Sequence, residues 1–195
     1  MKTVKTIAIL TIASLTILSS CKKGANDPFL SLHSRKARVA GDWTLKKFDE
    51  TYTSGSTTTV TTYDGTTKVE TTSGSSSSST YSLKYKFDKK GTYTMTQTET
   101  ISGWTDQRDE TGTWNFTSGV GKDKNKDHIV IKTLTQTNKS GTLPASTTTY
   151  TGDDAPVAMY YLDELKNKTM VLKYEGTYAS GSSKESDKQT MTFEQ

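Results

Sequence analysis

The sequence predicts an all-β fold, an antiparallel up-and-down barrel of about eight strands with a short N-terminal helix. From residue 42 onward apolar side chains alternate with polar ones in short segments, and Gly-, Asp- and Ser-rich turn signals separate these segments. Only 31% of the residues are hydrophobic, but Thr is β-branched and aromatic residues are spread along the chain. A row of such strands must hide its edges, and short turns between consecutive strands favour closure into a barrel.

The first residues predict export. Lys2 and Lys5 accompany an apolar run, residues 7–18, that is too short to span a membrane as a helix. The run ends in Leu18-Ser19-Ser20-Cys21, which resembles the lipobox of bacterial lipoproteins. In that family the cysteine is acylated, for example with palmitate, and becomes the first mature residue. We therefore expect a lipoprotein signal peptide over residues 1–20 and lipidation at Cys21; the alternative is an ordinary signal peptide with a chance cysteine.

Cys21 also bears on location and chemistry. It is the only cysteine, so lipidation leaves none for a disulfide or a thiolate metal site. Lys22 stands where an Asp would retain a lipoprotein at the inner membrane of enteric bacteria, and no acidic cluster that would favour surface export follows. We expect a protein lipid-anchored in the outer membrane of the cell envelope, on its periplasmic face.

The mature chain is expected to consist of a tether, residues 21–26, and one domain, residues 27–195. Asp27-Pro28 is typical of the N-cap and first residue of a helix, which we expect to end near Gly41. The apolar side of this helix would consist of Phe29, Leu32 and Val39.

Eight or nine short strands are expected after the helix. Trp43 and Leu45 begin the first one, with polar residues between and beside them, as in a strand with one buried face. The later strands are expected around residues 81–87, 93–95, 114–116, 128–134, 157–161, 169–174 and 190–193.

The segment 54–80 is almost entirely Thr, Ser and Gly. Tyr63-Asp64-Gly65-Thr66 predicts a hairpin turn with polar arms over residues 57–62 and 67–72, and we expect residues 73–79 to be a flexible run. The segment is either a solvated hairpin with a linker or a projecting binding loop, and its composition favours the first interpretation.

Several short motifs together resemble one family. Gly41-Asp42-Trp43 after a short helix resembles the Gly-x-Trp opening of lipocalins, and over residues 27–175 the chain resembles the lipocalin-like lipoproteins of Bacteroidota. The resemblance implies a barrel with the helix at one end and Trp43 packed over that end. Typical lipocalins also carry an Arg on a late strand against this Trp, whereas no arginine follows Arg108 here, so a transport function does not transfer directly. The other motifs are Gly91-Thr92-Tyr93, Gly112-Thr113-Trp114-Asn115-Phe116 and Leu162-Asp163-Glu164-Leu165.

The remaining motifs argue against several function classes. Basic and acidic residues number 25 and 21, without the clustering typical of nucleic-acid binding. His33 and His128 lie far apart, residues 123–127 lack the glycine and glutamate that complete a calcium loop, and no Gly-x-Ser-x-Gly motif is present. Residues 106–110 and 153–154 are interpreted as solvated turns. We expect no enzyme activity, no cofactor, no metal site and no nucleic-acid partner.

Bulky aromatic residues occupy most positions expected to face the barrel interior. An eight-stranded barrel is just wide enough either to be filled by its own side chains or to hold one small ligand. Two functions therefore remain open: a barrel that binds a small apolar or amphiphilic ligand, or a structural or protein-interaction module with a filled core that contacts an envelope protein through its loops. The candidate ligand-binding residues are Trp43, Tyr85, Tyr93, Trp114, Tyr161 and Tyr174.

Overall fold

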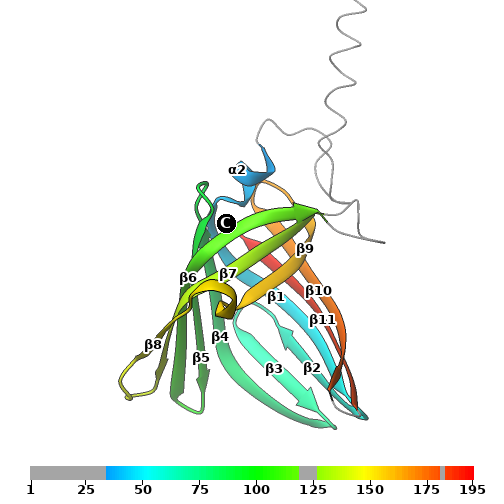
Figure 1. Ribbon diagram of the computed structural model, residues 1–195. Coiled ribbons are helices and arrows are strands. Elements are labelled where there is room, and N and C mark those ends of the chain that lie inside the picture. The colour runs from blue at the N-terminus through cyan, green and yellow to red at the C-terminus, as the bar shows by residue number, and fades with distance from the viewer. Residues whose placement is uncertain (1–33, 119–126, 181–182) are drawn as a thin grey trace, which may run out of the picture.

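The chain forms a closed, all-antiparallel up-and-down β-barrel (Figure 1). This computed structural model describes residues 34–118, 127–180 and 183–195. Within them, ten strands build the barrel, one strand lies outside it, and one short α-helix stands at one end. The predicted closed barrel and N-terminal helix are thus confirmed, whereas the predicted strand number of about eight was too low. The predicted signal peptide, Cys21, the tether and His33 lie outside the described residues.

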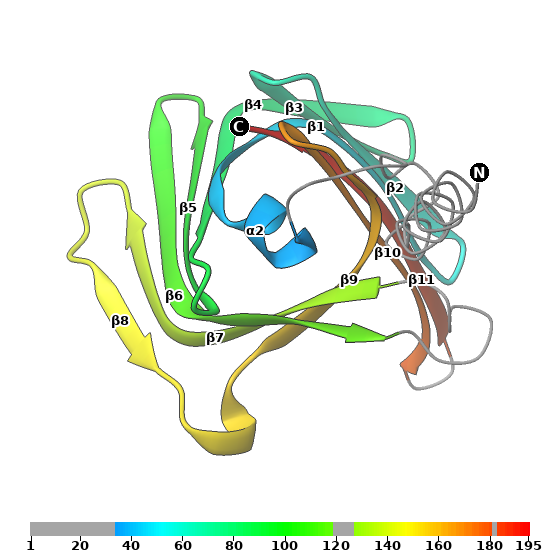
Figure 2. The ribbon, with the colours of Figure 1, turned by 90° about the horizontal axis from the view of Figure 1, so that it is seen from above.

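Consecutive strands pair as antiparallel neighbours, except that β9 pairs with β7 and not with the outer strand β8. The barrel order is β6-β5-β4-β3-β2-β1-β11-β10-β9-β7, and pairing of β6 with β7 closes the ring. The outer strand β8 pairs only with β7 and lies outside the ring when the barrel is seen from above (Figure 2). The elements are α2 (Arg35–Val39), β1 (Gly41–Ser54), β2 (Thr57–Tyr63), β3 (Thr67–Thr72), β4 (Ser75–Phe87), β5 (Thr92–Ile101), β6 (Trp104–Ser118), β7 (Asp127–Ser140), β8 (Ser146–Thr149), the 3₁₀ turn η3 (Gly152–Asp154), β9 (Val157–Leu165), β10 (Thr169–Ser180) and β11 (Ser183–Glu194).

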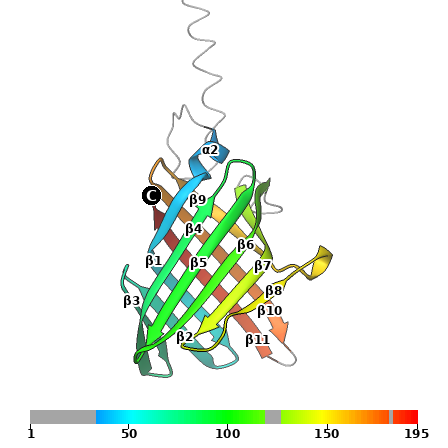
Figure 3. The same ribbon diagram turned by 90° about the vertical axis from the view of Figure 1, so that its left-hand side faces the viewer.

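The two ends of the barrel differ in their pairing. At the α2 end β1 pairs directly with β4, for example Trp43 with Tyr85. Farther along, from Phe48 to Ser54, β1 pairs with β2 instead, so the β2–β3 hairpin is inserted between β1 and β4. On the opposite side β9 pairs with β10 only as far as Tyr161 and Lys173. The barrel therefore widens away from α2 (Figure 3), and we call this part the wide end.

The inserted hairpin explains the strand number. Asp64 Oδ1 accepts hydrogen bonds from the backbone N–H groups of Thr66 (3.0 Å) and Thr67 (2.9 Å), which fixes the predicted turn between β2 and β3. The predicted flexible run was wrong, because Ser75 begins β4 and residues 75–80 pair along the whole of β3. Hydroxyl pairs such as Thr59–Thr72 (2.7 Å) connect the neighbouring strands of this polar region. The strands therefore form part of the barrel wall although they have no apolar face of their own.

An apolar core fills the α2 end. Trp43, Leu172 and Phe193 are completely or almost completely buried there, and α2 covers this end of the ring (Figure 2). The core also holds Val39, Leu45, Tyr63, Leu83, Phe87, Tyr93, Met95, Trp114, Ile129, Ile131, Leu162, Leu165, Met170 and Met191. Aromatic rings in contact, such as Phe87 and Trp114 with centroids 5.5 Å apart, contribute to this packing.

Polar contacts hold α2 on the barrel. Ser34 caps the helix by accepting a hydrogen bond from the Ala37 N–H (3.2 Å). Trp43 Nε1 donates to the carbonyl oxygen of Val39 (2.7 Å), Arg38 donates to the carbonyl oxygen of Leu165, and Arg35 forms an ion pair with Asp127. The buried arginine at this end of the barrel therefore comes from the helix and not from a late strand. Of the predicted apolar helix side, only Val39 lies within the described residues.

Candidate functional site: the barrel lumen

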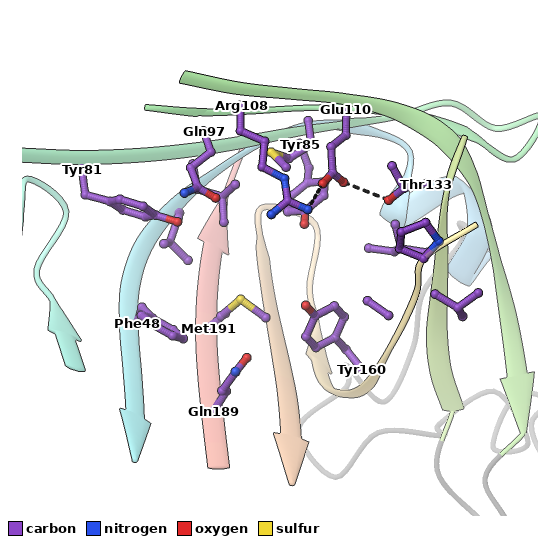
Figure 4. A pocket seen from close by; sticks show the side chains of 17 residues that line it. Phe48, Tyr81, Tyr85, Gln97, Arg108, Glu110, Thr133, Tyr160, Gln189 and Met191 are labelled. Atoms are coloured by element: carbon purple, nitrogen blue, oxygen red, sulfur yellow. Dashed lines mark hydrogen bonds and ion pairs between the residues drawn. The ribbon is translucent and has the colours of Figure 1, made fainter. Parts of the chain in front are cut away.

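The lumen contains a cavity of about 290 Å³ between the apolar core and the wide end (Figure 4). Leu45, Leu83 and Ile131 line the side of the cavity toward α2, while Gln97, Arg108 and Gln189 lie toward the wide end on the same strands or their neighbours. The cavity thus has an apolar side and a polar side. The other lining residues are Phe48, Tyr81, Tyr85, Met95, Glu110, Thr133, Pro156, Val157, Ala158, Tyr160 and Met191.

Glu110 is a buried carboxylate in the wall of this cavity. It is 5% exposed, and its Oε2 accepts hydrogen bonds from the hydroxyl groups of Tyr93 (3.1 Å) and Thr133 (3.0 Å). The guanidinium of Arg108 forms an ion pair with its other oxygen (Figure 4). A buried charge is expensive unless it is paired and hydrogen-bonded, and Glu110 has both kinds of partner.

Gly112 allows these groups to meet. A Cβ at this position would lie 2.0 Å from the carbonyl oxygen of Lys132 and 2.8 Å from the Tyr93 ring. The absence of a side chain lets β7 approach β6 where their register shifts, next to the pairing of Gly112 with Thr133. The close approach brings Thr133 and the Tyr93 ring to Glu110.

Three tyrosine hydroxyl groups in the cavity wall are free to bind. Tyr81, Tyr85 and Tyr160 line the cavity, and none of their hydroxyl groups forms a hydrogen bond with another described residue. Burial is the main cause that raises the pKa of each phenol above its usual value, and for Tyr160 the charge of Glu110 adds to the effect. These side chains therefore remain protonated at neutral pH and offer neutral donors to a ligand.

Two carboxylates stand next to the cavity at Gln189. The side-chain nitrogen of Gln189 donates to Glu50 Oε1 and to Asp187 Oδ2, both at 2.8 Å. Burial raises the pKa of both carboxyl groups, and for Glu50 repulsion by Asp187 raises it further. No Lys or Arg among the described residues forms an ion pair with either group.

Of the aromatic residues predicted to bind a ligand, Tyr85 lines the cavity and Tyr93 lies behind its wall at Glu110. Trp43 and Trp114 belong to the core of the α2 end. Trp114 Nε1 donates to the carbonyl oxygen of Asp88 (2.9 Å), as Trp43 Nε1 does to Val39, so both indoles already have partners. These two residues hold the barrel together and do not face the cavity.

Tyr161 and Tyr174 lie apart from the cavity. Neighbouring Tyr160 lines it, and because successive side chains of a strand alternate, Tyr161 lies on the other face. There Tyr161 contacts the His128 ring and donates to Asp163 (3.2 Å). Tyr174 shares the face of Leu172, but its ring lies over Gly176. The sequence-based interpretation chose Tyr161, whereas its neighbour Tyr160 lines the cavity. The register of β9 with β10 is irregular, and the alternation pattern alone does not reveal this.

The sequence-based interpretation missed the polar residues of the lumen. Residues 106–110 were expected to form a solvated turn, but they lie within β6, and Arg108 and Glu110 reach the cavity. A signal was present: Arg108, Glu110, Gly112 and Trp114 share one face by alternation, which extends the strand backward from its apolar residues. Residues 153–154, interpreted in the same way, are exposed in η3.

Comparison with protein-family models, with curated proteins and with solved structures gives no match. Within the described part of the chain, no group of three or more His, Cys, Asp or Glu side chains is placed to hold a metal ion. No helix in that part is long and apolar enough to cross a membrane. The site must therefore be interpreted from its own geometry.

Proposed function

We propose that this protein binds a small amphiphilic molecule in the lumen of its barrel and has no catalytic role. The observation that carries the proposal is the cavity itself, whose lining combines aliphatic side chains with tyrosine hydroxyl groups that have no hydrogen-bond partner among the described residues. Ligand sites are typically concave and mostly apolar, with a few polar groups that orient the ligand. The core blocks the α2 end, so the ligand enters from the wide end.

A lipid anchor and a relationship to lipocalin-like proteins are part of the same proposal. A lipocalin-like relationship is supported by the helix over one end and by Trp43 packed beneath it. The Leu18-Ser19-Ser20-Cys21 motif supports acylation of Cys21. Lys22 in place of an Asp, with no acidic cluster after it, supports residence on the periplasmic face of the outer membrane. Because Cys21 precedes α2 closely in the chain, the wide end faces away from the membrane surface in this arrangement.

Ligand binding can be tested with a neutral apolar fluorescent dye such as N-phenylnaphthylamine, titrated into the purified protein. Ala158→Trp places an indole in the cavity wall and should abolish the fluorescence increase. Met159→Trp is the matched control, because Met159 is the next residue of β9 and is 51% exposed. Thermal unfolding of both variants verifies that they fold. Absence of dye binding by the unaltered protein, or equal loss in the two variants, would refute a lumen site.

The anchor can be tested in cells that produce the full chain. Mass spectrometry of the mature N-terminal peptide should find acyl chains on Cys21, and Cys21→Ser should release the protein from the membrane fraction. Protease added to intact cells should leave the anchored protein uncut. Digestion would place it on the cell surface, and an unmodified Cys21 would contradict the lipoprotein assignment.

A protein-interaction role is the second candidate, and exposed apolar side chains favour it. Ile101 and Trp104 are about half exposed at the β5–β6 turn, and Leu143 is 56% exposed after β7. Trp104 Nε1 donates to Ser140 Oγ (3.1 Å), which holds the indole at the surface. Crosslinking in intact cells should recover an envelope protein that Trp104→Ala no longer captures. An unchanged crosslinking pattern would eliminate this surface.

A further inference from the structure

Carboxylates on two neighbouring strands share the lumen face at the wide end. On β1, Glu50 follows Phe48 at the alternation of two, and on β11 Asp187 and Glu185 precede Gln189 in the same way. Phe48 and Gln189 line the cavity, so their face is the lumen face. Strand pairing confirms the arrangement, since Glu50 lies opposite Gln189. We call Glu50, Asp187 and Glu185 the rim carboxylates.

The rim carboxylates have no positive partner among the described residues. Two cations do extend from lumen faces, but each is already paired: Lys68 with Glu99, and Arg108 with Glu110. The rim carboxylates form hydrogen bonds only to neutral groups, such as Gln189 for Asp187 and the Tyr52 hydroxyl for Glu185 (3.0 Å). The whole chain carries a formal net charge of +4, so the negative lumen is opposite in sign to the protein.

Asp187 and Glu50 are held together by a single amide. The Gln189 nitrogen contacts one oxygen of each, and the other oxygen of Asp187, Oδ1, is buried without a hydrogen-bond donor among the described residues. A buried acceptor without a donor is unfavourable, and two like charges at one site repel each other. A bound cation would relieve both conditions.

Aromatic rings at the polar side of the cavity suit the same kind of charge. Phe48, Tyr81 and Tyr160 line the cavity, and Figure 4 shows their side chains around it together with Arg108 and Gln189. Cations bind favourably over such rings. The lumen already contains one example, because Lys68 Nζ lies 5.3 Å from the centroid of the Tyr81 ring.

From this arrangement we infer that the lumen selects amphiphiles whose headgroup is positively charged, such as a protonated amine on an apolar body. The inference rests on the proposed lumen site and specifies its ligand class. The apolar body lies against Leu83 and Ile131, and the ammonium group lies near Gln189, where the rim carboxylates and the Tyr160 ring attract it. Arg108 does not offset this preference, because Glu110 neutralises it.

Three ligands with the same chain and different heads test the inference: octylammonium, octanol and octanoate, each titrated against the dye-loaded full-length protein at neutral pH. Octylammonium should displace the dye with an affinity at least about tenfold above that of octanoate, a difference of about 1.4 kcal/mol. Octanol should lie between them. Added salt should weaken octylammonium binding most, because screening acts on the charged contact.

The double variant Glu50→Gln with Asp187→Asn should reduce the preference to near zero while still binding the dye. Glu175→Gln is the control, because Glu175 is exposed between Tyr174 and Gly176 on the other face of β10. It removes a carboxylate without touching the lumen and should leave the preference unchanged. Equal effects of the two changes would mean that only the net charge of the protein matters, and would overturn the inference.

The outcomes separate this inference from the proposed function. If the dye binds and the three ligands compete equally, or octanoate competes best, the charge selection is wrong and the lumen site stands. If the dye binds and octylammonium does not displace it, the charge selection is likewise wrong. If neither the dye nor any of the three binds, the lumen site itself is refuted.

Discussion

The α2 end and the wide end are built from the same strands but have opposite interiors. On β1 the lumen face begins with Trp43 and Leu45, both buried, and continues to Glu50. On β11 it runs from Asp187 to Phe193, which is completely buried. Each strand thus contributes apolar side chains to a core at one end and polar side chains to a cavity at the other. Stability and binding are therefore expected to respond to different halves of one strand.

The physical reason lies in how each half is held together. Burying a large apolar side chain contributes about 1.5–3 kcal/mol, and the α2 end concentrates such residues. At the wide end the wall depends on backbone pairing and hydroxyl contacts such as Thr71–Ser76 (2.8 Å). A net hydrogen bond contributes only about 0.5–1.5 kcal/mol. The wide end can therefore carry unpaired polar groups because the other end provides most of the stability.

The strongest test of this contrast is Trp43→Ala. The indole is completely buried and its Nε1 holds the last turn of α2, so the free energy of unfolding should fall by about 3–5 kcal/mol. Urea denaturation followed by circular dichroism measures the change. A loss below 1 kcal/mol, which is about the size of an ordinary surface effect, would show that the α2 end is not the stabilising half.

Substitution of Glu110 tests the region where the apolar core of the α2 end meets the polar wide end. Glu110→Ala removes the acceptor of Tyr93 and Thr133 and leaves Arg108 without its carboxylate, so the free energy of unfolding should fall by about 1–3 kcal/mol. Glu110→Gln retains an acceptor and should cost less. The same denaturation assay ranks the two variants, and the reverse order would mean that the carboxylate is strained where it lies.

Tyr160→Phe tests whether a residue of the cavity contributes to ligand binding more than to stability. The Tyr160 hydroxyl faces the cavity without a partner among the described residues, so the free energy of unfolding should change by less than about 0.5 kcal/mol. Affinity for octanol in the dye-displacement assay should decrease, because one donor is lost. Tyr93→Phe is the companion variant: its hydroxyl is bonded to Glu110, so stability should decrease more than with Tyr160→Phe. Equal stability losses would contradict the assignment of unpaired groups to the wide end.

The smallest expected effect is on the pH dependence of stability. The pKa values of Glu50 and Asp187 are raised by burial, with further repulsion of Glu50 by Asp187 and Glu70, and both carboxyl groups are partly exposed. Because these groups bind protons more tightly in the folded state, their unfavourable contribution at neutral pH diminishes as the pH falls through their raised pKa values.

Melting temperatures measured across the acid range test this sign. The double variant Glu50→Gln with Asp187→Asn should melt slightly higher than the unaltered protein at neutral pH, and the difference should vanish in acid. A double variant that melts lower than the unaltered protein at neutral pH, with the deficit disappearing in acid, would mean that the two carboxylates stabilise the fold and have an unrecognised positive partner.

Much of the barrel is predictable because its signals are local. The alternation in β4, β5 and β6 and the Asp64-Gly65 turn each depend on neighbours in the chain, and the structure confirms them. The sequence-based prediction was wrong at residues whose structure depends on pairing with another strand. Residues 75–79 pair with β3 although Ser and Gly are typical of linkers, and the face of Tyr161 depends on the register of β9.

The amino-acid sequence by itself determined the fold class, the closed row of strands and the position of the short helix, because side-chain period and turn residues are local properties. Only the tertiary structure decided that β2 and β3 widen the wall, that Glu110 and Arg108 pair inside it, and that Glu50 and Asp187 meet at Gln189. The insertion of β2 and β3 into the wall and the meeting of Glu50 with Asp187 depend on strands distant in the chain. Arg108 and Glu110 are close in the chain, but the energy of their ion pair depends on its burial in the barrel, which no single segment reveals.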